Sequence, residues 1–127
     1  MFLLDTQLLL WAAFEPTRLS AKTAALLESR DSSLIFSLAN LWKVAIKTSL
    51  DRAGFSVDPA VLLRGLLAEG IVKLPLRLQH FFIVASLPWV PKGPFDGLLL
   101  AQAAEEGVTL LTADATLRRF GKFVKVV

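Results

Sequence analysis

The chain lacks cysteine, has a single histidine and contains no long apolar run, and each feature excludes a class of protein. Without cysteine there are no disulfides and no thiolate metal ligands, which suits a reducing cytosol. A membrane span is not expected, because no stretch of about 18 apolar residues is free of charge. The first five residues have no basic region and already contain an acid, which argues against a signal peptide. We therefore expect a cytoplasmic protein with no membrane partner.

Motifs of several common α/β enzymes are missing as well. No Gly-x-Gly-x-x-Gly follows the first apolar run, and there is no Walker loop and no serine-hydrolase elbow. Position 7 is Gln, where haloacid-dehalogenase-type phosphatases have a second aspartate, and the acidic pair of a receiver domain is not evident. The one histidine, His80, is followed by Phe81 and Phe82, which favours a packing or surface role over catalysis.

Composition indicates one domain, residues 1–127, that is long enough to bury a core. Hydrophobic residues make up 54% and charged residues 20%, so the chain is apolar for its size. Surplus apolar surface on a small domain indicates a subunit or partner interface. The formal net charge of +3 is modest and suits a polyanion such as RNA. The basic residues are spread along the chain, so a solvated surface is the default interpretation of most of them.

Strand-like and helical segments alternate along the sequence. The strands are predicted at residues 2–5, 33–36, 71–74, 108–111 and 123–127. The helices are predicted at residues 6–14, 21–29, 38–50, 59–69, 78–87, 95–106 and 115–120. Capping residues support these boundaries: Ser20, Ser37 and Asp58 begin helices, and Gly70 and Gly107 end them. The alternation predicts an α/β fold, a three-layer α/β/α sandwich with a mainly parallel central sheet of four to five strands.

Three aspartates occupy the ends of these elements. Asp5 and Asp114 each follow a strand-like run, and Asp96 opens the helix predicted at 95–106. The carboxyl ends of parallel strands share one edge of a sheet, so the three side chains could meet there. Converging carboxylates hold hard divalent cations, which indicates a site for Mg²⁺ or Mn²⁺ acting on phosphate. The alternative is structural: Asp5 and Asp114 are helix caps, and Asp96 is a first-turn acid that favours the helix dipole.

Four segments occur in an order typical of one known family. They are Leu3-Leu4-Asp5-Thr6-Gln7-Leu8-Leu9-Leu10-Trp11, Ser37-Leu38-Ala39-Asn40-Leu41-Trp42-Lys43-Val44-Ala45-Ile46-Lys47, Pro94-Phe95-Asp96-Gly97-Leu98-Leu99-Leu100-Ala101-Gln102-Ala103, and Leu111-Thr112-Ala113-Asp114. They resemble the Leu-Leu-Asp-Thr-His-x-Leu-Leu-Trp, Ser-x-x-Ser-x-Trp-Glu-Ile-Ala-Ile-Lys, Asp-Pro-Phe-Asp-Arg-Leu-Leu-x-Ala-Gln-Ala and Thr-Ala-Asp segments of PIN-domain ribonucleases, specifically VapC-type toxins of bacterial toxin–antitoxin pairs. One block alone would be weak, whereas four in register span nearly the whole chain.

The resemblance implies a PIN-like fold and metal-dependent cleavage of RNA. Asp5, Asp96 and Asp114 fall on three of the family's four acidic positions, where Mg²⁺ or Mn²⁺ is bound. Supporting residues are expected at positions that match the same motifs, namely Thr6, Ser37, Asn40, Lys43 and Thr112. The resemblance also implies an RNA substrate, a homodimer and a cognate antitoxin. The antitoxin's helical tail would lie in an apolar groove and push a basic side chain into the acidic pocket.

The chain departs from the family at Lys43, which stands at the fourth acidic position. Gly93, Gly97 and Gln7 also replace the family's usual Asp, Arg and His. An ammonium about 5 Å from a divalent ion, at an effective dielectric near 20, would repel it by up to about 7 kcal/mol. Millimolar binding of a metal is worth only about 4 kcal/mol.

Two arrangements of Lys43 remain open, and both predict weak or absent metal. In the first, Lys43 turns aside and leaves a weak three-aspartate site. In the second, its ammonium forms salt bridges with Asp5 and Asp96 and replaces the ion. The function is then either a weakened endoribonuclease toxin or a degenerate domain that binds RNA or antitoxin without cleaving. A structure-specific DNA nuclease is a third, weaker reading.

Helical spacing and aromatic content give further expectations. Trp42, Ala45 and Ile46 are predicted to face inward, which would place Lys43 at the border of the crevice. The three tryptophans, Trp11, Trp42 and Trp89, are expected to be core or interface anchors rather than base-stacking platforms.

Overall fold

The computed structural model describes residues 1–50, 54–88 and 94–127. The strands are β1 (Phe2–Leu4), β2 (Leu34–Ser37), β3 (Val72–Leu74), β4 (Thr109–Thr112) and β5 (Val124–Val126). The helices are α1 (Thr6–Phe14), α2 (Ala21–Glu28), α3 (Leu38–Leu50), α4 (Pro59–Ala68), α5 (Leu78–Ser86) and α6 (Pro94–Glu106). The chain also contains the 3₁₀ segments η1 (Pro16–Arg18) and η3 (Ala115–Phe123).

The five strands form one sheet in the order β3-β2-β1-β4-β5, and every neighbouring pair is parallel. β1 lies at the centre, with Leu3 opposite Ile35 of β2 and Leu110 of β4. The parallel α/β fold predicted from the sequence is confirmed. Because every strand runs the same way, all the carboxyl ends lie on one edge of the sheet.

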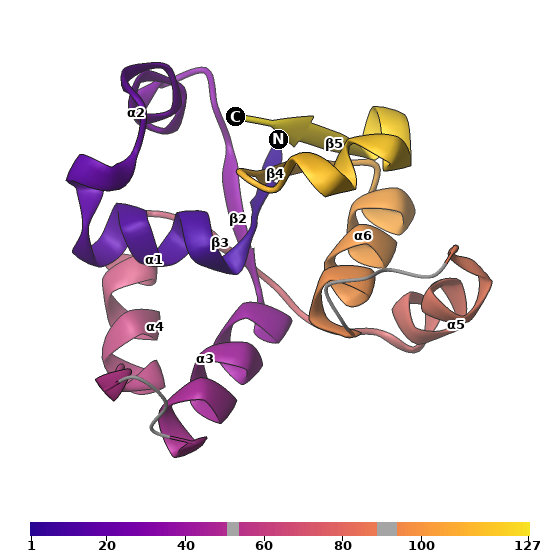
Figure 1. Cartoon of the computed structure of the whole chain (residues 1–127), viewed down its shortest axis with the longest axis horizontal. Helices are drawn as coiled ribbons and strands as arrows, with labels where there is room; N and C mark the ends of the chain where they lie inside the picture. The colour runs from indigo at the N-terminus through magenta and orange to yellow at the C-terminus, as the bar shows by residue number, and fades with distance from the viewer. Residues whose placement is uncertain (51–53, 89–93) are drawn as a thin grey trace.

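Helices cover both faces of this sheet (Figure 1). Leu3 and Leu110 belong to the core under α5, α6 and η3, whereas the next residues, Leu4 and Leu111, belong to the core under α1, α2 and α4. Successive side chains of a strand point to opposite faces, so neighbouring leucines enter different cores. This explains why the strands are almost wholly apolar instead of alternating.

Local capping rules set most helix boundaries as predicted. Ser20 Oγ accepts a hydrogen bond from the Thr23 N–H at the start of α2, and Asp58 Oδ1 accepts one from the Ala60 N–H at the start of α4. After α6 the chain reverses at Gly107, whose φ of 67° falls in the left-handed region that glycine adopts without cost.

The prediction of which side of α3 faces inward was wrong. Trp42 is 50% exposed and Ala45 is exposed, whereas the buried residues of α3 are Ala39, Asn40 and Val44. The Trp42 ring packs edge-on against Phe95 at the start of α6, with 4.8 Å between centroids. The helix is therefore rotated so that small and amide side chains face the sheet edge, and the indole covers a neighbouring helix instead.

Two further differences concern segment type and coverage. The C-terminal turn is a 3₁₀ helix that extends to Phe123, because Gly121 adopts a φ of 67° and lets the chain kink and continue. Two of the residues singled out in the sequence, Trp89 and Gly93, lie outside the described residues. Within the described ranges, no helix is long and apolar enough to cross a membrane.

Candidate functional site

The carboxyl edge of the central strands gathers the polar residues expected from the sequence. Asp5 directly follows β1, Ser37 is the last residue of β2, and Thr112 is the last residue of β4. α6 ends at Glu106, just before β4 begins, so its other end, with Asp96, lies at the carboxyl edge. Figure 1 shows α1, α3 and α6 all starting near this edge of the sheet.

Asp5 is held in place by both of its carboxylate oxygens. Its Oδ1 accepts a hydrogen bond of 2.7 Å from the Gln7 N–H, so it caps α1. Its Oδ2 accepts a hydrogen bond from the Thr112 hydroxyl, whose oxygen in turn accepts one of 3.0 Å from the Asp114 N–H. The side chain is only 9% exposed, and these donors offset the cost of burying its charge.

A second network of buried side chains connects α1, β2, α3 and α6. Asn40 Nδ2 donates to Thr6 Oγ1 at 2.9 Å, and Asn40 Oδ1 accepts from the Ser37 N–H at 2.7 Å. The Ser37 hydroxyl donates to Gln102 Oε1 on α6. All four residues are buried, so the fold brings the supporting positions Thr6, Ser37 and Asn40 together. A buried network of this kind is stable only when each of its polar groups has a partner.

Gln102 was missed as a site-adjacent residue in the sequence reasoning. It is completely buried in α6 and connects that helix to the end of β2 and to the Pro75 carbonyl. A signal was present, because Gln102 is the one amide within a helix segment of leucine, alanine and glycine from 97 to 103. A polar side chain on a buried face requires a partner, which marks such a position for attention.

The other two predicted acids differ in their surroundings. Asp96, in the first turn of α6, is 7% exposed. Asp114 is partly exposed and caps η3, with its Oδ1 accepting hydrogen bonds from the Thr116 N–H at 2.9 Å and the Thr116 hydroxyl at 2.6 Å. The capping alternative therefore holds for Asp5 and Asp114, and a capping carboxylate oxygen still has a second lone pair for another ligand.

The carboxylates do not form a ready-made metal site. Among the residues that the structure describes, no group of three His, Cys, Asp or Glu side chains lies close enough together to hold a metal ion. Both oxygens of Asp5 and one oxygen of Asp114 are already used by donors from the protein. The residues therefore do not fit a three-carboxylate Mg²⁺ or Mn²⁺ centre in this arrangement.

Lys43 is partly buried and lies beside the start of α6. Its Nζ is 5.9 Å from the centroid of the Phe95 ring, next to Asp96 in the sequence. Across residues 1–50, 54–88 and 94–127, none of the ion pairs found involves Lys43. Within the described residues, the salt bridges of Lys43 with Asp5 and Asp96 that form one of the two predicted arrangements are not seen.

His80 has a structural position, as expected. It is completely buried, its Nδ1 accepts from the Arg77 N–H at 3.0 Å, and its Nε2 lies 3.0 Å from Glu106 Oε1. Because Nδ1 is an acceptor, Nε2 carries the hydrogen and donates a hydrogen bond to the Glu106 carboxylate. The Arg77 guanidinium binds the same Glu106 oxygen at 2.7 Å, so the cluster fastens α5 to the end of α6.

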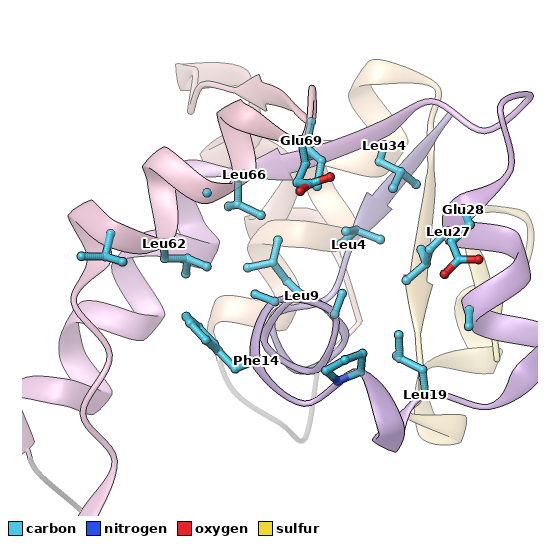
Figure 2. A pocket seen from close by; sticks show the side chains of 17 residues that line it. Leu4, Leu9, Phe14, Leu19, Leu27, Glu28, Leu34, Leu62, Leu66 and Glu69 are labelled. Carbon is cyan, nitrogen blue, oxygen red and sulfur yellow. The ribbon is translucent and has the colours of Figure 1, made fainter.

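A separate hollow is not lined by these acids. It has a volume of about 640 Å³ and lies between α1, α2 and α4 (Figure 2). Leu9 and Phe14 line it from α1, Leu27 from α2, and Leu62 from α4. Figure 2 shows two carboxyl groups among these apolar side chains, those of Glu28 and Glu69. A mostly apolar hollow with a few charged groups suits the apolar face of an amphipathic helix.

Comparison with known proteins agrees with this architecture. A family model described as "PIN domain" matches residues 2–123. Among solved structures, a chain of the VapBC2 complex from Rickettsia felis, bound to a DNA fragment from their promoter, is similar with a TM-score of 0.71. The likeness covers 98% of this chain and 97% of that one at 16% identity. A search of curated proteins found no match.

Proposed function

Because the chain belongs to the PIN domain family, we propose that it is an endoribonuclease toxin of the VapC type, weakened at its acidic site by Lys43. The family membership supports a nuclease in general. The proposal adds the RNA substrate, the residues Asp5, Asp96 and Asp114, and a pairing with an antitoxin. It treats the whole chain, residues 1–127, as one catalytic domain.

The observation that carries the proposal is the burial of two carboxylates at the carboxyl edge of the central strands. Asp5 is 9% exposed and Asp96 is 7% exposed. Burying a carboxylate is costly unless donors or cations compensate, and Asp5 is compensated by the Gln7 N–H and the Thr112 hydroxyl. Acids placed at this edge in a parallel α/β sheet lie where ligands bind. The hydroxyls of Thr6 and Thr112 and the Asn40 amide then hold and orient the groups around them.

Metal dependence is proposed in its weak form. The described carboxylates do not group in threes, and Lys43 brings a positive charge to the start of α6. We propose that binding of Mg²⁺ or Mn²⁺ is weak or absent and that cleavage is correspondingly slow or absent.

A second candidate function rests on the same two observations. A PIN domain without a three-acid group, and with lysine at an acidic position, could retain its binding surfaces and lose its chemistry. This candidate is a degenerate domain that binds RNA or antitoxin without cutting.

The hollow between α1, α2 and α4 is the proposed binding site of the antitoxin. Its apolar lining suits the buried face of an amphipathic helix, and Glu28 and Glu69 would pair with basic residues of that helix. The similar Rickettsia felis structure is a VapBC2 complex, which supports the existence of such a partner. A small reading frame beside the gene, coding for a DNA-binding protein, would identify the partner to be tested.

The cleavage experiment compares the unaltered chain with Asp96→Asn on structured RNA in Mg²⁺ or Mn²⁺. We expect slow cleavage that Asp96→Asn abolishes and that a chelator stops. Asp31→Asn is the matched control, because Asp31 is exposed and lies before β2, at the opposite end of that strand from Ser37, and it should leave cleavage unchanged. Chelator-resistant RNA binding without cleavage would favour the degenerate domain, and cleavage restricted to branched DNA would favour the structure-specific nuclease.

A further inference from the structure

The net positive charge of this protein comes from one end of the chain. Of the 14 Lys and Arg residues, four lie within residues 115–127, which contain no acid. The remaining residues hold ten Lys and Arg against all 11 Asp and Glu, a formal charge of −1. The entire positive excess of the protein therefore comes from Arg118, Arg119, Lys122 and Lys125, which we call the basic strip.

The basic strip begins beside the proposed nuclease site. Asp114 caps η3, and the first cation of the strip, Arg118, follows within that same 3₁₀ segment. From there the chain passes Lys122 and enters β5, the outermost strand on the β4 side of the sheet. Figure 1 shows this last part of the chain along one side of the sheet, away from α3 and α4. A polymer held at the acidic site could therefore continue along the strip.

The side chains of the strip divide into anchors and exposed cations. Phe120 and Phe123 are partly buried and pack against the core that also contains Leu117. Arg118, Lys122 and Lys125 are exposed. Aromatic residues interleaved with cations are typical of nucleic-acid contacts. In this protein the rings instead hold the segment on the fold, so the contact would come from the cations and would depend on charge rather than stacking.

Lys125 alone has a simpler explanation, because lysine on an edge strand discourages pairing with other chains. That explanation does not extend to η3, which is not a strand, yet holds three of the four cations. Four exposed cations that follow one another in sequence with no acid between them suit a polyanion rather than a neutral partner.

We propose that the basic strip binds the backbone of the RNA strand whose scissile phosphate lies at the acidic edge. The inference rests on the proposed function for its substrate and adds the path that the strand follows. The contact is with phosphate and carries no sequence preference. It raises affinity for RNA and leaves the rate of the chemical step unchanged.

The test is the triple variant Arg118→Ala, Lys122→Ala, Lys125→Ala. Arg119 and Lys122 each lie over a neighbouring phenylalanine ring, but Arg119 makes a further contact within the fold and is therefore left in place. The probe is a fluorescein-labelled single-stranded RNA of mixed sequence, and both proteins carry Asp96→Asn so that the probe stays intact. Three lost phosphate contacts should lower the slope of log K against log salt by about 2 and weaken binding near physiological salt by about ten- to fiftyfold.

Two control variants keep this test interpretable. A triple variant with Lys22→Ala, Arg30→Ala and Lys73→Ala removes the same charge from exposed positions on α2, the loop after it and β3, and should lose much less affinity. A charge-preserving variant with Arg118→Lys, Lys122→Arg and Lys125→Arg should bind as the unaltered chain does. Equal losses in the two alanine triples, or an unchanged salt slope in the strip variant, would overturn the inference.

The cleavage assay separates this inference from the proposed function. With Asp96 intact, the strip variant should cut RNA with an unchanged kcat and a KM raised by the same factor as the loss of affinity. An unchanged KM, with cleavage still abolished by Asp96→Asn, would contradict RNA binding by the basic strip and support the nuclease activity. RNA binding through the basic strip, with no cleavage by the unaltered chain or any variant, would support the strip and contradict the nuclease activity. A strip variant that loses affinity for double-stranded DNA but not for RNA would contradict the proposal.

Discussion

Asp5 shows how one residue can serve the fold and a site together. Its carboxylate caps α1 through the Gln7 N–H and is tied to β4 through the Thr112 hydroxyl. Such a residue satisfies the capping interpretation and the site interpretation of the sequence at once. Lys43, whose Nζ lies 5.9 Å from the centroid of the Phe95 ring, is the residue whose charge we propose to weaken metal binding.

The residue-scale prediction is that Lys43→Glu tightens Mn²⁺ binding at least tenfold, measured by calorimetric titration. The substitution removes a positive charge near the start of α6 and adds a negative one. Tenfold corresponds to about 1.4 kcal/mol, a small part of the Coulomb energy available at an effective dielectric near 20, which allows for screening by solvent. RNA cleavage should rise together with affinity.

Lys47→Glu is the matched control for this change. It makes the same change of charge one turn further along α3, where Nζ lies 5.0 Å from the Phe55 centroid. An equal gain in Mn²⁺ affinity from both variants would show a general effect of net charge. No gain from Lys43→Glu would show that Lys43 does not weaken metal binding.

At the scale of the element, α4 and α6 show how glycine acts by position. Gly65 lies inside α4 and lines the groove, and a Cβ built on it meets nothing within 4 Å. Gly107 also has open space, but its φ of 67° is one that other residues adopt at a cost. A substitution at Gly65 therefore tests helix propensity, and a substitution at Gly107 tests backbone strain.

We expect Gly65→Ala to stabilise the protein by about 0.5–1 kcal/mol, because alanine is the better residue inside a helix. Gly107→Ala should destabilise it by about 1 kcal/mol or more, because of the left-handed backbone conformation. The free energy of unfolding in urea measures both. Stabilisation by Gly65→Ala together with destabilisation by Gly107→Ala is the expected result. Destabilisation by Gly65→Ala would mean that the hollow between α1, α2 and α4 is smaller than it is in this structure.

At the scale of the whole molecule, apolar surface remains uncovered on α5. Leu78 is 71% exposed, Phe82 is 70% exposed and Phe81 is 47% exposed. These side chains are neighbours on one helix, and a contiguous apolar patch of this kind marks an interface. The surplus of apolar residues noted in the sequence is thus located in part on this helix and in part in the groove.

We propose that the α5 face joins two copies of the chain, as the family resemblance implies. Phe82→Glu should convert a dimer into a monomer in sedimentation equilibrium, because it places a charge within the apolar contact. Leu67→Glu, at a 52% exposed position on α4, should leave the association unchanged. A monomer before substitution, or a dimer that survives Phe82→Glu, would contradict this assignment.

Local chemistry determined most of the fold from the sequence alone. Ser20, Asp58 and Gly107 set helix ends through hydrogen bonds or backbone angles that involve only nearby residues. Apolar runs bounded by such residues then specified five strands, of which the three central ones are buried, and the alternation with helices specified parallel pairing. The four segments typical of PIN domains are likewise short and contiguous, so they could be read without coordinates.

Only the tertiary structure decided what depends on a distant partner. It rotated α3 so that Asn40 is buried and Trp42 is half exposed, because the burial of a helix face depends on which elements pack against it. It paired Gln102 with Ser37, and it left the acids of the carboxyl edge without a three-carboxylate group among the described residues. Contacts between residues far apart in sequence leave no local pattern, so their geometry follows from how the layers pack.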